Sequence, residues 1–140
     1  MEKLSHFIVN HWLLVTAFIL AFIALIIVEA RSKGMGGNRL SPQQATVLIN
    51  QEEGVVVDIR EADAFNSGHI VNAIHIPAMQ LEQQLKRLEA FKKRPLIIVC
   101  ATGQKSPWAM KVIKKHNFDR VYVLAGGMNA WTTAGIPVVK

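Results

Sequence analysis

The first thirty residues are far more apolar than the rest of the chain. The stretch from Trp12 to Val28 contains no charged residue, and Thr16 is its only polar side chain. At about 1.5 Å per helical residue, a helix from Phe7 to Val28 is long enough to cross a hydrocarbon core of roughly 30 Å. We therefore predict a transmembrane anchor over residues 1–30.

A cleavable signal peptide is the main alternative for this segment. Residues 28–30 loosely resemble a cleavage site, and Lys3 supplies a positive charge near the N-terminus. However, the apolar run is longer than the roughly 7–15 residues of a signal core, and Glu2 weakens the positive N-terminal region. These features favour an anchor that is retained.

The charges around the apolar segment predict its orientation. Arg31, Lys33 and Arg39 follow the segment closely, whereas Lys3 alone precedes it. Basic residues accumulate on the cytoplasmic side of membrane spans. We therefore expect a single-pass protein of the cell membrane whose C-terminal domain faces the cytoplasm.

The remainder of the chain alternates between apolar runs of strand length and segments with helical periodicity. Residues 31–38 contain three glycines and indicate a linker, so that one domain of ordinary size is expected over residues 39–140. Alternating strands and helices are typical of an α/β fold with a small, mainly parallel sheet flanked by helices. The pattern predicts strands at 55–57, 74–76, 96–99 and 121–124, helices at 41–50, 61–66, 79–91 and 106–116, and a helical turn at Trp131.

Capping residues define the start of two of these helices. Ser41, Pro42 and Gln44 match the N-cap, N1 and N3 positions of a capping box. Ser106 and Pro107 suggest an N-cap and N1 for a second helix. In the helix expected over 79–91, leucines at positions 81, 85 and 88 form one core-facing stripe.

The only cysteine, Cys100, directly follows the strand expected at 96–99. Ligands of open α/β sheets bind beyond the carboxyl ends of the strands, and Asp58 occupies the same kind of position. A short loop from Ala101 to Lys105 then leads into a helix, and inward N–H groups there would favour the thiolate. A buried cysteine that merely fills the core is equally consistent with this position.

The charged and polar residues also limit the expected chemistry. A single cysteine forms no intramolecular disulfide, and no His, Cys and carboxylate spacing matches a metal site, so we expect neither a metal nor a cofactor. From position 39 onward the chain has thirteen Lys and Arg against eight Asp and Glu. This positive excess favours binding to anionic lipid at the membrane surface. The basic clusters lack interleaved aromatic residues, so we expect no nucleic acid. Ala17 and Ala21 have the spacing that packs one membrane helix on another, which suggests a membrane-protein partner.

Three sequence blocks resemble the rhodanese homology domain. The first begins with Asp58-Ile59-Arg60 and continues through Gly68-His69-Ile70 to Pro77. The second is the loop from Cys100 to Ser106, and the third runs from Gly126 to Trp131 and on to Pro137. The three blocks occur in the order and at about the spacing of the family, and the resemblance covers the chain from about Leu40 to Val139.

This resemblance implies a sulfurtransferase with Cys100 as the nucleophile. The cysteine would take a sulfane sulfur from thiosulfate or a persulfide and pass it to a thiol or cyanide acceptor. Asp58 and Arg60 would orient the loop or shape the pocket rim, or form only a structural ion pair. The donor-binding backbone would be that of Ala101, Thr102, Gly103, Gln104, Lys105 and Ser106.

The sequence departs from the family pattern at Lys105, where active members usually have arginine. Lysine keeps the charge but loses the bidentate fork for an oxyanion, so thiosulfate turnover is expected to be weak. A protein-interaction or redox-sensing module without catalysis is therefore the alternative function. Phosphatases of related fold fit less well, since their loops are one residue longer than the six residues from Cys100 to Lys105.

Overall fold

The chain divides into two compact units, Met1–Gly37 and Asn38–Lys140. The computed structural model describes the backbone throughout and the side chains of residues 1–29 and 37–140. Most residues of the predicted linker, 31–38, are ones whose side chains are not described, so the linker stays a prediction.

The first unit consists of helices α1 (Glu2–Asn10) and α2 (Trp12–Gly36). By length and composition, the segment Trp12–Glu29 of α2 is able to cross a membrane, although a signal sequence near an N-terminus would meet the same criterion. Its large apolar side chains are exposed, as in Phe18 and Leu20. Contact with lipid would remove the cost of exposing these side chains to water.

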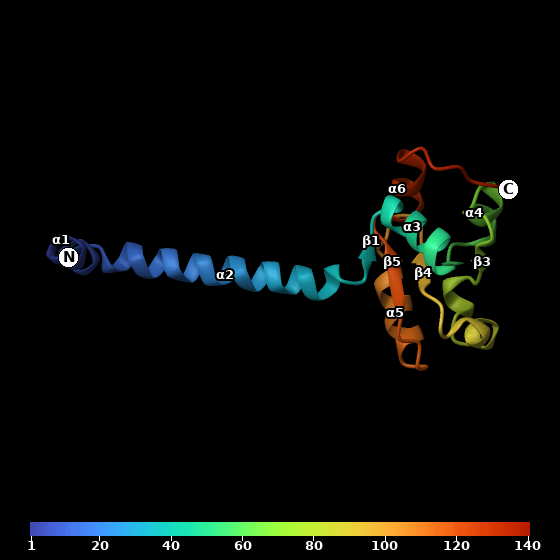
Figure 1. Cartoon of the computed structure of the whole chain (residues 1–140), viewed down its shortest axis with the longest axis horizontal. Coiled ribbons are helices and arrows are strands. Elements are labelled where there is room, and N and C mark those ends of the chain that lie inside the picture. The colour runs from blue at the N-terminus through green and yellow to red at the C-terminus, as the bar shows by residue number, and fades with distance from the viewer. The chain divides into compact units, whose positions relative to one another are not determined.

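The second unit is built on a five-stranded sheet in which every neighbouring pair of strands is parallel (Figure 1). The strand order is β1-β5-β4-β2-β3. The strands are β1 (Arg39–Leu40), β2 (Val55–Asp58), β3 (Ile74–His75), β4 (Leu96–Val99) and β5 (Val121–Leu124). This arrangement confirms the predicted parallel α/β fold.

Helices cover both faces of this sheet, which explains why the central strand β4 is apolar and buried at every position. Alternate side chains of a strand point to opposite faces. Ile98 packs in the same core as α5 (Ser106–Lys114) and the 3₁₀ helix η2 (Leu85–Phe91). Its neighbour Ile97 packs in the core with α3 (Pro42–Glu52) and α6 (Gly127–Thr133).

The segment predicted as one helix over 79–91 is instead two 3₁₀ helices, and this prediction was wrong. Helix η1 covers Ala78–Gln80, and η2 follows after a turn. Its leucine stripe is nevertheless buried at positions 81, 85 and 88. In η2 the core side chains Leu85, Leu88 and Phe91 recur every third residue, which suits the three residues per turn of a 3₁₀ helix.

The predicted caps are correct for one helix and wrong for the other. Ser41 and Gln44 form the capping box of α3, with their reciprocal hydrogen bonds at 3.2 and 3.0 Å. In α5 the N-cap is Lys105, and Ser106 is the first helical residue. The hydroxyl of Ser106 makes no capping hydrogen bond and is buried. The short helix α4 (Ala62–Ser67) ends at Gly68, close to where it was expected.

Candidate active site

Two adjacent strands bring Asp58 and Cys100 to the same edge of the sheet. Asp58 is the last residue of β2 and pairs in register with Val99, the last residue of β4. The backbone N–H of Ile59 donates to the Val99 carbonyl at 3.0 Å, so the two chain segments are held together as they leave the sheet. Cys100 comes directly after Val99, and its side chain is only 3% exposed.

The loop after Cys100 curls so that its backbone faces the sulfur. Gly103 adopts a positive φ of 85°, and its N–H donates to the Cys100 Sγ at 2.9 Å. A side chain at this position would be strained, and its Cβ would lie 3.0 Å from the backbone nitrogen of Gly126. Glycine is therefore required both by the backbone turn and by the segment behind it.

The start of α6 fixes this loop from behind. The N–H groups of Met128 and Asn129 donate to the carbonyls of Cys100 and Ala101 at 2.8 and 3.1 Å. Gly127 lies so close that an added Cβ would be 2.2 Å from the Cys100 carbonyl oxygen. The glycine pair Gly126-Gly127 therefore supports the cysteine loop directly.

Opposing effects set the pKa of Cys100. Burial raises the pKa of the thiol, but Ser106 lowers it through its hydroxyl and its backbone N–H. The N–H groups of Lys105 and Gly103 lower it further, and the resulting pKa lies below the usual value. The site therefore favours the thiolate, which is the nucleophilic form of cysteine.

The hydroxyl of Ser106 is fully buried, yet within the described part of the chain it has no partner in hydrogen-bonding geometry. It is near enough to Cys100 to lower the pKa of the thiol, although the geometry falls outside that of a hydrogen bond. An unpaired buried hydroxyl is costly. This donor is thus available to a group bound on the sulfur.

A cavity of about 240 Å³ opens onto Cys100. Its walls come from the loop of Cys100 and from the segment that follows β2. The lining residues are Ile59, Arg60, Glu61, Ala64, Cys100, Ala101, Thr102, Gln104 and Lys105. Sequence reasoning missed Glu61 and Ala64, although their place after a strand end was the available signal.

Asp58 and Arg60 form an ion pair at the wall of this cavity. The Arg60 Nη2 donates to the Asp58 carboxylate at 2.8 Å and to the Gly68 carbonyl at 2.7 Å. Asp58 is buried, so its charge is compensated by this partner. The ring of His75 contacts the Arg60 carbonyl at 2.8 Å and stacks on Phe65. Asp58 therefore contacts Arg60 rather than the sulfur, while Arg60 itself lines the cavity.

The other predicted loop residues differ in how they face the cavity. Gly103 and Ser106 are buried, whereas Ala101, Thr102, Gln104 and Lys105 are exposed. The exposed side chain of Lys105 lines the cavity and brings positive charge to it.

Known proteins resemble the chain over its whole length as well as over the domain alone. It is 31% identical to the uncharacterized protein BU052 of Buchnera aphidicola over 99% of the chain and 97% of that protein. It is 29% identical to the uncharacterized protein YibN of Escherichia coli over 100% of the chain and 99% of that protein. The thiosulfate sulfurtransferase GlpE of Pseudomonas putida is 37% identical over 66% of this chain and 83% of its own length.

Solved structures share the fold of the second unit. A rhodanese-related protein from Thermoplasma volcanium superposes with a TM-score of 0.65 and 26% identity, covering 73% of this chain and 97% of that one. Residues 41–134 match the rhodanese-like domain family. This match spans more than half of the chain and contains both the cysteine loop and the start of α6. The chain therefore belongs to the rhodanese-like domain family.

Proposed function

We propose that this protein is a membrane-anchored sulfurtransferase that carries sulfane sulfur as a persulfide on Cys100. The observation that carries the proposal is the environment of the sulfur, in which the Gly103 N–H donates to Sγ and the Ser106 hydroxyl is buried without a partner. Both groups stabilise a negative charge at this point. Such an environment supports a thiolate before reaction and a persulfide anion after it.

The first half-reaction requires no separate base, because the lowered pKa of Cys100 favours the thiolate. The thiolate attacks the outer sulfur of thiosulfate and a new S–S bond forms. The S–S bond within thiosulfate breaks, and sulfite leaves with the bonding electron pair. The cavity of about 240 Å³ is of a size for this small dianion, and Lys105 at its wall supplies positive charge.

The second half-reaction returns the enzyme to its starting state. A thiolate or cyanide attacks the outer sulfur of the persulfide, and Cys100 leaves as a thiolate. Its lowered pKa makes it a good leaving group, which favours this step. The backbone donors of the loop then stabilise the same negative charge as before.

The apolar segment Trp12–Glu29 supports membrane anchoring in this proposal. The basic residues after it support a domain that faces the cytoplasm, where the free thiol would stay reduced. Sulfur transfer would then take place near the membrane surface.

Intact-mass measurement of the full chain after incubation with thiosulfate tests the proposal. We expect a gain of one sulfur atom that cyanide removes and that is absent in Cys100→Ser. If several donors, including thiosulfate and a low-mass persulfide, produce no gain, the sulfurtransferase proposal fails and a non-catalytic interaction module takes its place.

A further inference from the structure

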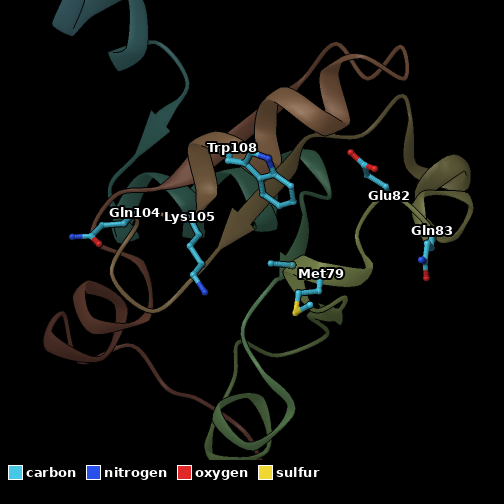
Figure 2. A pocket seen from close by; sticks show the side chains of 7 residues that line it. Met79, Glu82, Gln83, Gln104, Lys105 and Trp108 are labelled. Carbon is cyan, nitrogen blue, oxygen red and sulfur yellow. The ribbon is translucent and has the colours of Figure 1, made fainter.

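A second and larger hollow lies beside the cysteine cavity. It has a volume of about 630 Å³ and is lined by residues of η1, of the turn that follows it, of the end of the cysteine loop, and of α5. Figure 2 shows Trp108 of α5 facing the side on which Met79 of η1 lies, with Lys105 and Glu82 to either side. We call this hollow the acceptor groove, defined by Met79, Glu82, Gln83, Gln104, Lys105 and Trp108.

The acceptor groove adjoins the cysteine cavity. Gln104 and Lys105 line both spaces, so these two exposed side chains are a shared wall. A molecule bound along the groove would thus have one end beside the mouth of the Cys100 cavity. The cavity of about 240 Å³ is smaller than a peptide-sized acceptor needs, so the groove would hold the rest of such an acceptor.

The surface of the acceptor groove is apolar at its centre. Met79 is 90% exposed and Trp108 is 48% exposed, although both are large apolar side chains. Exposed tryptophan and methionine are enriched where proteins bind partners, and methionine adapts its shape to an apolar occupant. Cyanide or a small polar thiol would leave this surface uncovered.

The charges at the two sides of the groove differ in sign. Lys105 stands next to the cysteine cavity, and Glu82 stands across Trp108 from it (Figure 2). Among the described residues, neither side chain has an ion-pair partner. An occupant that brings its reacting thiolate to Lys105 and a basic group to Glu82 complements both charges.

We propose that the acceptor groove binds a cysteine-containing segment of a partner protein, with an apolar residue beside the cysteine and a basic residue further along. This inference rests on the proposed sulfurtransferase function and identifies its acceptor. The Cys100 persulfide anion first takes up a proton from water. The segment's thiolate then attacks its outer sulfur, and the bond from that sulfur to Sγ breaks. The outer sulfur and its proton leave as a persulfide on the partner, and Cys100 regains its thiolate, with no net oxidation or reduction.

Three peptides with blocked termini test the groove as sulfur acceptors. Their sequences are Lys-Leu-Cys-Leu-Lys, Lys-Ser-Cys-Ser-Lys and Glu-Leu-Cys-Leu-Glu. The donor is the full chain in detergent, whose Cys100 is first loaded with sulfur and checked by intact mass. The rate of persulfide loss to each peptide is divided by the rate of loss to cyanide in the same variant. Met79→Ser and Glu82→Lys alter the groove, and Val47→Ser, at a side chain 51% exposed on α3, is the matched surface control.

We expect the normalised transfer rate to Lys-Leu-Cys-Leu-Lys to exceed that to Lys-Ser-Cys-Ser-Lys by about tenfold. This is the factor expected when part of one leucine side chain is buried. Met79→Ser should reduce this preference by roughly threefold or more, because it removes an apolar contact. Val47→Ser should keep the wild-type preference. Glu82→Lys should shift preference toward the peptide with glutamates.

Equal rates for the leucine and serine peptides would overturn the proposal, and so would a Met79→Ser variant that keeps the full preference. An unchanged charge preference in Glu82→Lys would overturn it equally. A chain that fails to load sulfur at all refutes the sulfurtransferase function instead, so the two failures are distinguishable.

Discussion

Replacing Gly127 with alanine tests whether α6 supports the cysteine loop by close backbone contact. Gly127 has a φ of 57°, and its added Cβ would lie 2.2 Å from the Cys100 carbonyl oxygen and 2.8 Å from the carbonyl carbon of Ala101. All of these atoms belong to the backbone, so no side-chain rotation relieves the contact. The loop or the start of α6 must move.

Gly135 provides a matched control, because its φ is 74° but an added Cβ would have no neighbour within 4 Å. The left-handed conformation alone costs about 1–2 kcal/mol for an L-residue with a side chain. Gly135→Ala should therefore lower the free energy of unfolding by about that amount. Gly127→Ala should lose a further 1–3 kcal/mol or so, which is the usual range for overpacking.

Urea unfolding of the full chain in detergent, followed by tryptophan fluorescence, measures both changes. The loading of sulfur on Cys100 in the folded fraction measures the displacement of the loop. We expect slower loading for Gly127→Ala and wild-type loading for Gly135→Ala. Equal destabilisation by the two substitutions, together with normal loading in both, would refute the argument that Gly127 holds the loop in place.

Three further predictions concern the sulfur site and the membrane. Ser106→Ala should raise the pKa of Cys100, because it removes a hydroxyl that lowers it, and the pH profile of iodoacetamide alkylation should shift to higher pH; an unshifted profile would remove Ser106 from the account. In both proteins the alkylation rate should fall as pH drops through the thiol pKa, since the thiolate is lost there. Lys105→Arg should raise the rate with thiosulfate by restoring a bidentate donor, and a lower rate would indicate adaptation to another donor. In a Cys100→Ser background, Met79→Cys supplies a thiol at a position where the native side chain is 90% exposed, and a membrane-impermeant reagent should label it only after cell lysis. Labelling in intact cells would reverse the predicted orientation.

The overall fold could be predicted because its signals are local. Runs such as Leu96–Val99 are apolar at every position, which is typical of strands buried on both faces. The two-residue strand Arg39–Leu40 was missed, because two residues hold no periodic pattern and the pairing with β5 is set by tertiary contact. The leucine stripe at 81, 85 and 88 indicated the buried face but not the helix type. The spacing of three from Leu85 to Leu88 suits an α-helix and a 3₁₀ helix alike, and the spacing of four from Leu81 to Leu85 spans the turn between η1 and η2.

The candidate site could be predicted only in part. The position of Cys100 followed from the strand that precedes it, and the capping pattern placed the end of its loop to within one residue. The contact of Gly127 with the Cys100 carbonyl joins segments that are far apart in sequence, so no local pattern contains it. The same holds for the acceptor groove, in which Met79 and Trp108 come from separate elements.

Thiosulfate with a heavy isotope in its outer sulfur alone tests the central claim most directly. The account predicts that the heavy sulfur appears on Cys100 by intact mass, that the released sulfite is unlabelled, and that added cyanide then removes the label as thiocyanate. Label in the sulfite, or heavy sulfur retained by a Cys100→Ser chain, would contradict a persulfide carried on this cysteine.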